Sequence, residues 1–130
     1  MPRLLIVDDN ASIRHIIRSL LEQQGYEICG EAEDGLQAID LAKELKPDLI
    51  LLDLSMPKLG GPQAASVLRR ELPKTRIILF TLFDDAFGKS VASAVGVDLV
   101  ISKTEGMAKL LHSVRTVLER NGGGQCVLSP

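Results

Sequence analysis

Four short segments of this chain, all rich in apolar residues, end at polar residues that could bind a metal ion and a phosphoryl group. These residues are Asp8 and Asp9 after the first segment, Asp53 after the second, Thr81 after the third and Lys103 after the fourth. Carboxylate oxygens are the ligands that hard divalent cations such as Mg²⁺ prefer. A hydroxyl and an ammonium group can bind the outer oxygens of a phosphoryl group.

The four segments have the length and composition of buried β-strands. They cover residues 4–7, 49–52, 77–80 and 99–102, and a weaker alternation predicts another strand over residues 27–32, nearer an edge. Because the first four are almost continuously apolar, they indicate a parallel sheet with helices on both faces.

Segments with helical periodicity follow the predicted strands. The first helix is expected to begin after Asp9 and to end at Gly25. Its predicted buried face consists of Ile13, Ile16, Ile17, Leu20 and Leu21. Further helices are predicted over residues 35–45, 62–71 and 86–95, and over a last segment with Met107, Leu110, Leu111, Val114 and Leu118 on one face. Five strand–helix units in a row predict a single doubly wound α/β domain with a five-stranded parallel sheet.

Such a sheet brings the carboxyl ends of its strands, and the residues that follow them, to one edge. A polar residue at a single strand end is more simply a solvated cap. Five at corresponding ends, with these functional groups, favour a shared site. Three neighbouring carboxylates repel one another unless a cation neutralises them, so we expect Asp8, Asp9 and Asp53 to surround Mg²⁺.

The composition is that of an ordinary globular domain and excludes several other classes. Of the 130 residues, 45% are hydrophobic and 25% are charged, which argues against disorder, coiled coils and membrane proteins. A net charge of −2 and only 3% aromatic residues argue against a nucleic-acid-binding surface. The two cysteines lack metal-ligand spacing, and the short apolar N-terminal run does not resemble a signal peptide, so we expect a cytoplasmic protein with reduced thiols.

Two other phosphate-handling sites are disfavoured by single residues. Gly88-Lys89-Ser90 could end a P-loop, but Phe83 stands where that motif needs its first glycine. A phosphatase of the haloacid-dehalogenase type has a second aspartate two residues after its nucleophile, and Ser55 stands there instead.

The four strand-end segments together resemble the response-regulator receiver domain of bacterial two-component systems. They read Ile6-Val7-Asp8-Asp9, Leu51-Leu52-Asp53-Leu54-Ser55-Met56-Pro57, Ile78-Leu79-Phe80-Thr81 and Ile101-Ser102-Lys103. The resemblance covers about residues 2–121 and is nearest the NarL/FixJ branch, because no proline follows Lys103. It implies a flavodoxin-like, CheY-like fold for a receiver domain over residues 1–121. Residues 122–130 are expected to be a flexible tail or a truncated linker.

The resemblance also implies the roles of the site residues. Asp53 would be the phosphoacceptor, a nucleophile that forms an acyl phosphate. Asp9, Asp53 and the backbone carbonyl of Ser55 would bind Mg²⁺ directly, Asp8 would act mainly through water, and Mn²⁺ is expected to substitute. The phosphoryl group would be bound by the side chains of Lys103 and Thr81 and by the backbone N–H groups of Leu54 and Leu82.

One position departs from the family pattern. An aromatic residue usually stands three residues before the lysine and moves with the threonine on phosphorylation, but this position is Val100. Valine has no large alternative rotamer, so a switch would depend more on backbone motion after Thr81.

We therefore expect a phosphorylation-activated signalling receiver. A histidine kinase or phosphotransfer protein would phosphorylate Asp53 and so change a surface formed by the fourth helix, last strand and last helix. That surface would bind a downstream protein or a second copy of the chain. No turnover of a separate substrate, no direct binding of nucleic acid by this chain and no membrane contact are expected. The alternatives are a constitutive interaction module that has lost switching, suggested by Val100, and a small phosphotransfer or hydrolase enzyme.

Overall fold

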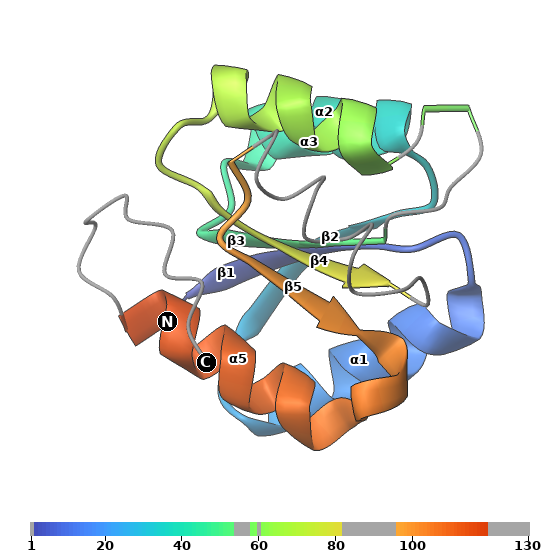
Figure 1. The fold of residues 1–130 in the computed structure, drawn as a ribbon, viewed down its shortest axis with the longest axis vertical. Helices are drawn as coiled ribbons and strands as arrows, with labels where there is room; N and C mark the ends of the chain where they lie inside the picture. The colour runs from blue at the N-terminus through green and yellow to red at the C-terminus, as the bar shows by residue number, and fades with distance from the viewer. Residues whose placement is uncertain (1, 54–57, 60, 82–95, 120–130) are drawn as a thin grey trace.

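A five-stranded parallel sheet forms the centre of the molecule (Figure 1). The structure is a computed structural model, and it describes residues 2–53, 58, 59, 61–81 and 96–119. Its strands are β1 (Arg3–Val7), β2 (Glu27–Ala32), β3 (Leu49–Leu52), β4 (Arg76–Thr81) and β5 (Leu99–Ser102), in the spatial order β2-β1-β3-β4-β5. The described helices are α1 (Ala11–Gln23), α2 (Gly35–Leu45), α3 (Gly61–Glu71) and α5 (Met107–Glu119), with a 3₁₀ turn η1 (Lys103–Glu105). This is the doubly wound, flavodoxin-like fold that the sequence predicts.

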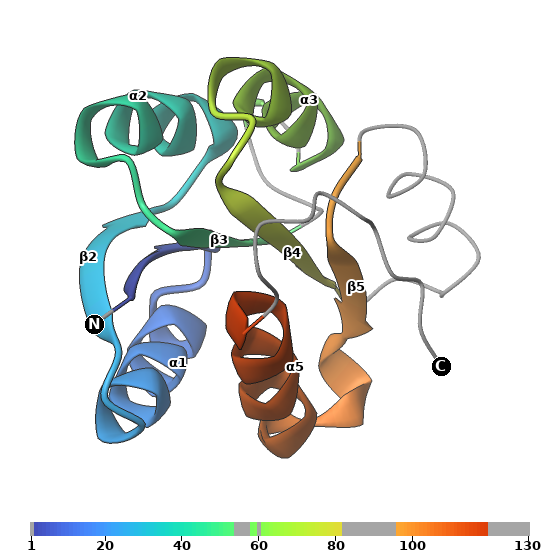
Figure 2. The same ribbon diagram turned by 90° about the vertical axis from the view of Figure 1, so that its left-hand side faces the viewer.

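The sheet separates two apolar cores, which explains why its strands are apolar without alternation. Figure 2 shows α2 and α3 on one face and α1 and α5 on the other. In β1, Leu5 and Val7 belong to the core under α2 and α3, whereas Leu4 and Ile6 belong to the core under α1 and α5. Successive side chains of a strand point to opposite faces, so both faces of such a strand favour apolar residues.

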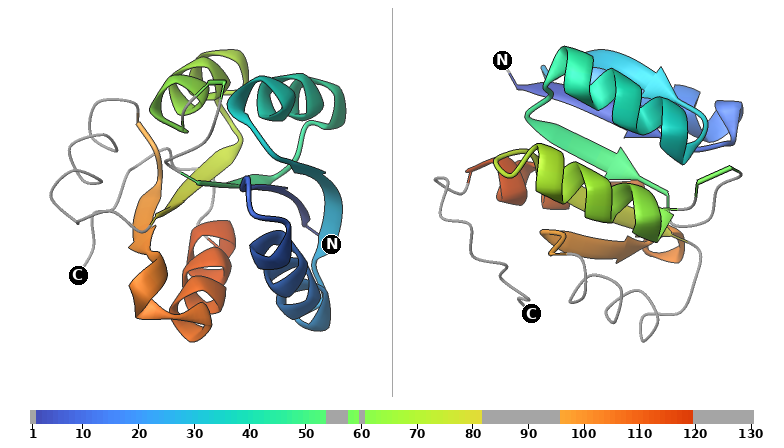
Figure 3. Two further views of the ribbon diagram at one scale, coloured as in Figure 1. Left: turned by 90° about the vertical axis from the view of Figure 1, so that its right-hand side faces the viewer. Right: turned by 90° about the horizontal axis from the view of Figure 1, so that it is seen from above.

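The helices α2 and α3 lie side by side over the sheet (Figure 3). Their buried small residues are Gly35, Ala38, Ala42, Ala64 and Ala65. A Cβ on Gly35 would lie 2.2 Å from the backbone oxygen of Leu59, so the close approach requires glycine there. The buried carboxylate of Asp34 caps α2 by accepting a hydrogen bond of 2.8 Å from Gln37 N.

The helix α1 starts and ends as its sequence predicts, but one of its predicted core residues is exposed. The Asn10 side chain caps the first turn, and Gly25 follows the last turn with a φ of +92°. Ile17 and Leu21 are fully buried, whereas Ile16 is 47% exposed. The five predicted apolar positions span a wider arc of the helix than the sheet covers, so a residue at the edge of that arc remains in solvent.

The other element predictions agree closely with the structure where it describes them. The edge position of β2, the helix over 35–45 and the strands over 49–52 and 99–102 are confirmed. The helix predicted over 86–95 and the tail predicted over 122–130 lie outside the described residues. Among the described helices, none has the length and hydropathy needed to cross a membrane.

Candidate functional site

The strand register aligns the ends of β1 and β3, where the first two groups of acidic residues lie. Val7 pairs with Leu52 in the parallel ladder, so Asp8 and Asp53 leave adjacent strands at the same level. The N–H of Asp53 donates to Val7 O over 2.9 Å, which continues the ladder one residue past β3. The two carboxylates are therefore positioned by the sheet rather than by flexible loops.

Asp8, Asp9 and Asp53 form the carboxylate cluster that the sequence predicts. Each offers an oxygen that lies within 4.8 Å of the oxygens offered by the other two. Asp8 and Asp53 are only 2% and 7% exposed, while Asp9 lies at the surface. Three carboxylates converging from two elements, with one open to solvent, form an oxygen donor set that fits Mg²⁺.

Lys103 completes the cluster from the end of β5. Its Nζ lies 2.7 Å from Asp8 Oδ2 and 3.5 Å from Asp53 Oδ1, and its side chain is 10% exposed. The ammonium also lies 5.8 Å from the ring centroid of Phe80, within the range of a cation–π contact. One ammonium shared by two carboxylates cannot neutralise three, so the cluster favours a further cation.

Asp8 is held in place by its side chain and by its backbone. Its Oδ1 accepts a hydrogen bond of 2.9 Å from Asn10 N, and its Oδ2 accepts the bond from Lys103. Its backbone N–H donates to Ala32 O of β2 over 3.1 Å. Both carboxylate oxygens of Asp8 thus have a protein donor, which fixes the turn that carries Asp9.

The remaining predicted site residues are described only in part. Thr81 is the last residue of β4 and pairs with Ser102. Val100 is half-buried and packs against the core under α2 and α3, so it lies within the sheet opposite Leu79. The phosphoryl-binding backbone predicted at Leu54 and Leu82 and the metal-binding carbonyl predicted at Ser55 lie outside the described residues.

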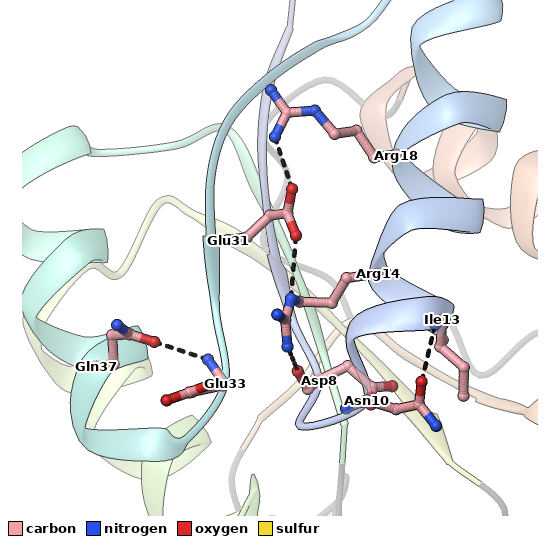
Figure 4. A network of polar contacts seen from close by, with 8 residues as sticks. All are labelled: Asp8, Asn10, Ile13, Arg14, Arg18, Glu31, Glu33 and Gln37. Atoms are coloured by element: carbon pink, nitrogen blue, oxygen red, sulfur yellow. Dashed lines mark hydrogen bonds and ion pairs between the residues drawn. The ribbon is translucent and has the colours of Figure 1, made fainter.

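A network of charged residues beside the cluster is absent from the expectations drawn from the sequence. Arg14 donates from Nη1 to Asp8 O over 2.6 Å and from Nε to Glu31 Oε1 over 3.0 Å (Figure 4). Arg18 Nη1 donates to Glu31 Oε2 over 2.6 Å. Burial raises the pKa of Glu31, but the hydrogen bonds from Arg18 and Arg14 outweigh it and hold that pKa below its usual value. The signal for this network in the sequence is Arg14, a basic residue in the first turn of α1, five positions after Asp9.

One pocket on the described surface lies away from this site. It opens at the amino ends of the strands, between residues such as Pro47, Thr75 and Leu118. None of the predicted site residues lines it. The carboxylate cluster and Lys103 lie at the opposite edge of the sheet.

The geometry agrees with known proteins of one family. A match to the response regulator receiver domain family extends over residues 4–115. The response regulator protein VraR from Staphylococcus epidermidis is 37% identical over 131 residues, which covers 98% of this chain and 60% of VraR. A LuxR-family two-component response regulator from Aurantimonas superposes with a TM-score of 0.86 at 29% identity, covering 91% of this chain and 85% of that chain.

A third similar structure is part of a complex. A chain in the crystal structure of the CheX–CheY–BeF₃–Mg²⁺ complex from Borrelia burgdorferi superposes with a TM-score of 0.85 at 26% identity, covering 91% of this chain and 90% of that chain. The present chain spans 57–60% of the length of the first curated relatives that it matches. From the family match, and from the likeness to VraR and the LuxR-family regulator, the chain belongs to the response-regulator receiver domains of two-component signalling, in their NarL/FixJ-like branch.

Proposed function

We propose that this chain accepts a phosphoryl group on Asp53 and thereby changes the partners that it binds. The observation that carries the proposal is the position of the Asp53 carboxylate, which is 7% exposed, lies within the cluster of three carboxylates and lies 3.5 Å from Lys103 Nζ. A carboxylate oxygen of Asp53 attacks phosphorus, a new O–P bond forms and the bond from phosphorus to the donor breaks, leaving an acyl phosphate. The departing group of the donor leaves with the electron pair of that bond.

We propose distinct roles toward the metal for the three carboxylates. Asp9 and Asp53 are proposed as direct ligands of Mg²⁺ or Mn²⁺ together with the Ser55 carbonyl. Asp8 is proposed to act through water, because both its oxygens already accept hydrogen bonds from the protein. A bound divalent cation supplies neutralising charge beside the transferred group. The similar chain from Borrelia belongs to a complex with both BeF₃ and Mg²⁺, which supports this assignment.

Lys103 and Thr81 are proposed to bind the phosphoryl oxygens once Asp53 has reacted. The ammonium of Lys103 already lies between Asp8 and Asp53, so it is in place to stabilise the charge that the transfer brings in. The hydroxyl of Thr81 and the backbone N–H groups of Leu54 and Leu82 are proposed to complete the binding of these oxygens. In-line transfer needs little more from the protein than this positioning and neutralisation.

The response to phosphorylation is proposed to pass through backbone movement after Thr81. Val100 packs in the sheet and has no large rotamer to exchange, which supports a backbone route. The surface that responds is proposed to include β5 and α5 and to bind a downstream protein or a second copy. The proposed donors are a sensor histidine kinase or a phosphotransfer protein in the cytoplasm.

The proposed domain spans residues 1–121, with residues 122–130 a flexible tail or a truncated linker. The family match over residues 4–115 lies within this proposed domain. We propose that the chain is a signalling protein that turns over no separate substrate. Hydrolysis of its own acyl phosphate does not count as such turnover. Direct contact with nucleic acid or membrane is not part of the proposed role of this chain.

The test is covalent labelling by acetyl phosphate and Mg²⁺, followed by intact mass and by amide NMR spectra with beryllofluoride. We expect the mass of the wild-type chain to increase by one phosphoryl group, and we expect no increase for Asp53→Asn. The matched control is Asp40→Asn, which removes an exposed carboxylate on α2 and should label like the wild type. Beryllofluoride should shift amides as far as β5 and α5.

Two results would contradict parts of this proposal. Labelling that persists in Asp53→Asn would show that another residue is the acceptor. Labelling on Asp53 without shifts in β5 and α5 would instead favour a constitutive interaction module over a switch.

A further inference from the structure

The turn that carries Asp9 is connected to β2 by the side chain of Arg14. Figure 4 shows this guanidinium between the turn and Glu31, with Nη1 directed to Asp8 O and Nε directed to Glu31 Oε1. The backbone N–H of Arg14 also donates to Asn10 O over 3.1 Å. Arg14 therefore contacts the residues on both sides of Asp9, once through its side chain and once through its backbone.

Glu31 holds this guanidinium in place. Its two oxygens accept from Arg14 and Arg18 over 3.0 and 2.6 Å, and its side chain is 28% exposed against 16% for that of Arg14. A guanidinium offers several donors in a planar fork, so it can serve a carbonyl and a carboxylate at once. The guanidinium that contacts Asp8 O is therefore also hydrogen-bonded to a residue of β2.

We propose that Arg14, anchored by Glu31, is a positioning residue that holds the Asp9 carboxylate where the metal binds. The inference rests on the proposed function, because it assumes that the carboxylate cluster binds Mg²⁺. Partners behind the direct ligands of a metal typically fix the geometry of those ligands and thereby its affinity. Asp9 is exposed, so the bonds to its neighbours Asp8 and Asn10 must restrict its position in place of packing.

A positioning role and a purely electrostatic role of Arg14 predict opposite changes in Mg²⁺ affinity when Arg14 is replaced. Arg14 carries a positive charge close to a cation site, so if charge alone mattered, Arg14→Gln would strengthen Mg²⁺ binding. If Arg14 holds the turn, the same substitution weakens binding because Asp9 samples positions away from the cluster. Arg14→Lys separates the two further, because it keeps the charge but replaces the fork by a single ammonium.

The experiment is an NMR titration of the full, unphosphorylated chain with MgCl₂, with labelling by acetyl phosphate measured on the same samples. We expect Arg14→Gln and Arg14→Lys each to weaken Mg²⁺ binding about tenfold, the size of effect typical for partners behind a ligand. Arg18→Gln is the matched control, since Arg18 contacts Glu31 but not the turn, and it should stay within about twofold of the wild type. Glu31→Gln keeps Arg14 and should fall between the two, which keeps the test available if Arg14→Gln does not fold.

The outcomes separate this inference from the proposed function. Unchanged or stronger Mg²⁺ binding by folded Arg14→Gln and Arg14→Lys would overturn the positioning role, even if Asp53 is labelled normally. The absence of Mg²⁺ binding by the wild type would overturn it as well. Weakened Mg²⁺ binding in both variants, together with a wild type that cannot be labelled, would support the positioning role and refute the proposed function.

Discussion

Charged side chains are arranged differently at the two ends of the sheet. At the carboxyl ends, three carboxylates converge and Lys103 is shared between two of them. At the amino ends, Asp98 accepts from Arg69 over 3.1 Å and from Ile77 N over 2.8 Å. The first arrangement contains more carboxylates than nearby ammonium groups, whereas the second pairs each charge with a local partner.

At the amino ends of the strands, hydrogen bonds connect neighbouring loops. Arg69 also donates to the backbone oxygens of Pro73 and Thr75, and Thr75 Oγ1 donates to Pro47 O. These bonds join the loops before β3, β4 and β5. Charges that already have local hydrogen-bonding partners offer little to a ligand, and removing one partner leaves the other charge uncompensated. An excess of negative charge at a buried edge, rather than the number of charges, distinguishes the end at which we propose the phosphoacceptor site.

The largest effect on stability is expected from breaking the Arg69–Asp98 pair at the amino ends of the strands. Asp98→Ala leaves Nη2 of Arg69 and the Ile77 N–H without the carboxylate oxygen that accepts from both. We expect the free energy of unfolding to fall by about 3 kcal/mol, the lower end of the range for breaking a buried pair, because this pair is partly exposed and the Ile77 N–H also loses its acceptor; Mg²⁺ should not restore this loss. Urea unfolding followed by circular dichroism measures this, since the chain has no tryptophan. Recovery of stability in Mg²⁺ would remove the proposed difference between the two ends.

Removing the ammonium of Lys103 at the carboxyl ends of the strands should lower the free energy of unfolding by less, and Mg²⁺ should reverse most of that loss. Lys103→Met leaves Asp8 and Asp53 facing each other without the shared cation. In EDTA we expect a loss of about 2 kcal/mol, because like charges in a buried site repel. Added Mg²⁺ should restore most of this loss in the same urea unfolding experiment. An equal loss with and without Mg²⁺ would argue against a cation site.

Mg²⁺ should also stabilise the wild type in proportion to its occupancy. At tenfold excess over the dissociation constant, binding to the folded state alone raises the free energy of unfolding by about 1.4 kcal/mol. Asp53→Asn should show much less of this stabilisation, while Asp40→Asn should show all of it. Thermal unfolding over a series of MgCl₂ concentrations measures the effect. Identical responses from both variants would place the cation elsewhere.

The pH dependence of stability should reveal the Glu31 network. The pKa of Glu31 is lower in the folded chain than its ordinary value of 4.5, so its contribution to stability is present above that value. This contribution is lost as the pH falls through the folded-state pKa. Glu31→Gln should therefore lower the free energy of unfolding most near neutrality, and its difference from the wild type should shrink as the pH falls below 4.5. A steeper acid dependence in Glu31→Gln would contradict the sign.

The smallest effect is expected at an exposed ion pair that belongs to neither end. Arg115 and Glu119 pair over 3.1 Å on α5, with side chains 73% and 66% exposed. Arg115→Gln should change the free energy of unfolding by no more than about 0.5 kcal/mol, as is usual for exposed pairs. It serves as the baseline for the other variants in the same unfolding measurements.

Much of the architecture was predictable because the signals were local. The continuous apolar runs predict buried parallel strands, and the residue after each run then lies at a known edge. The exposure of Ile16 was not predictable, because periodicity gives the direction of a helix face but not how far the sheet reaches around it.

The candidate site divides in the same way. Asp8, Asp53 and Lys103 were predictable, since each directly follows a strand. The link from Arg14 to Glu31 was not, because these residues lie on different elements, 17 positions apart. Only the packing of α1 beside β2 brings them together. The packing of Val100 against the core under α2 and α3 likewise depends on the register with β4.

The most direct test is a crystal structure of the chain grown with beryllofluoride and Mg²⁺. We predict beryllofluoride on a carboxylate oxygen of Asp53, a metal ion in contact with Asp9 and Asp53, and the ammonium of Lys103 beside the fluoride atoms. An occupied site elsewhere, or three carboxylates with no metal between them under these conditions, would contradict the assignment of this edge as the phosphoacceptor site.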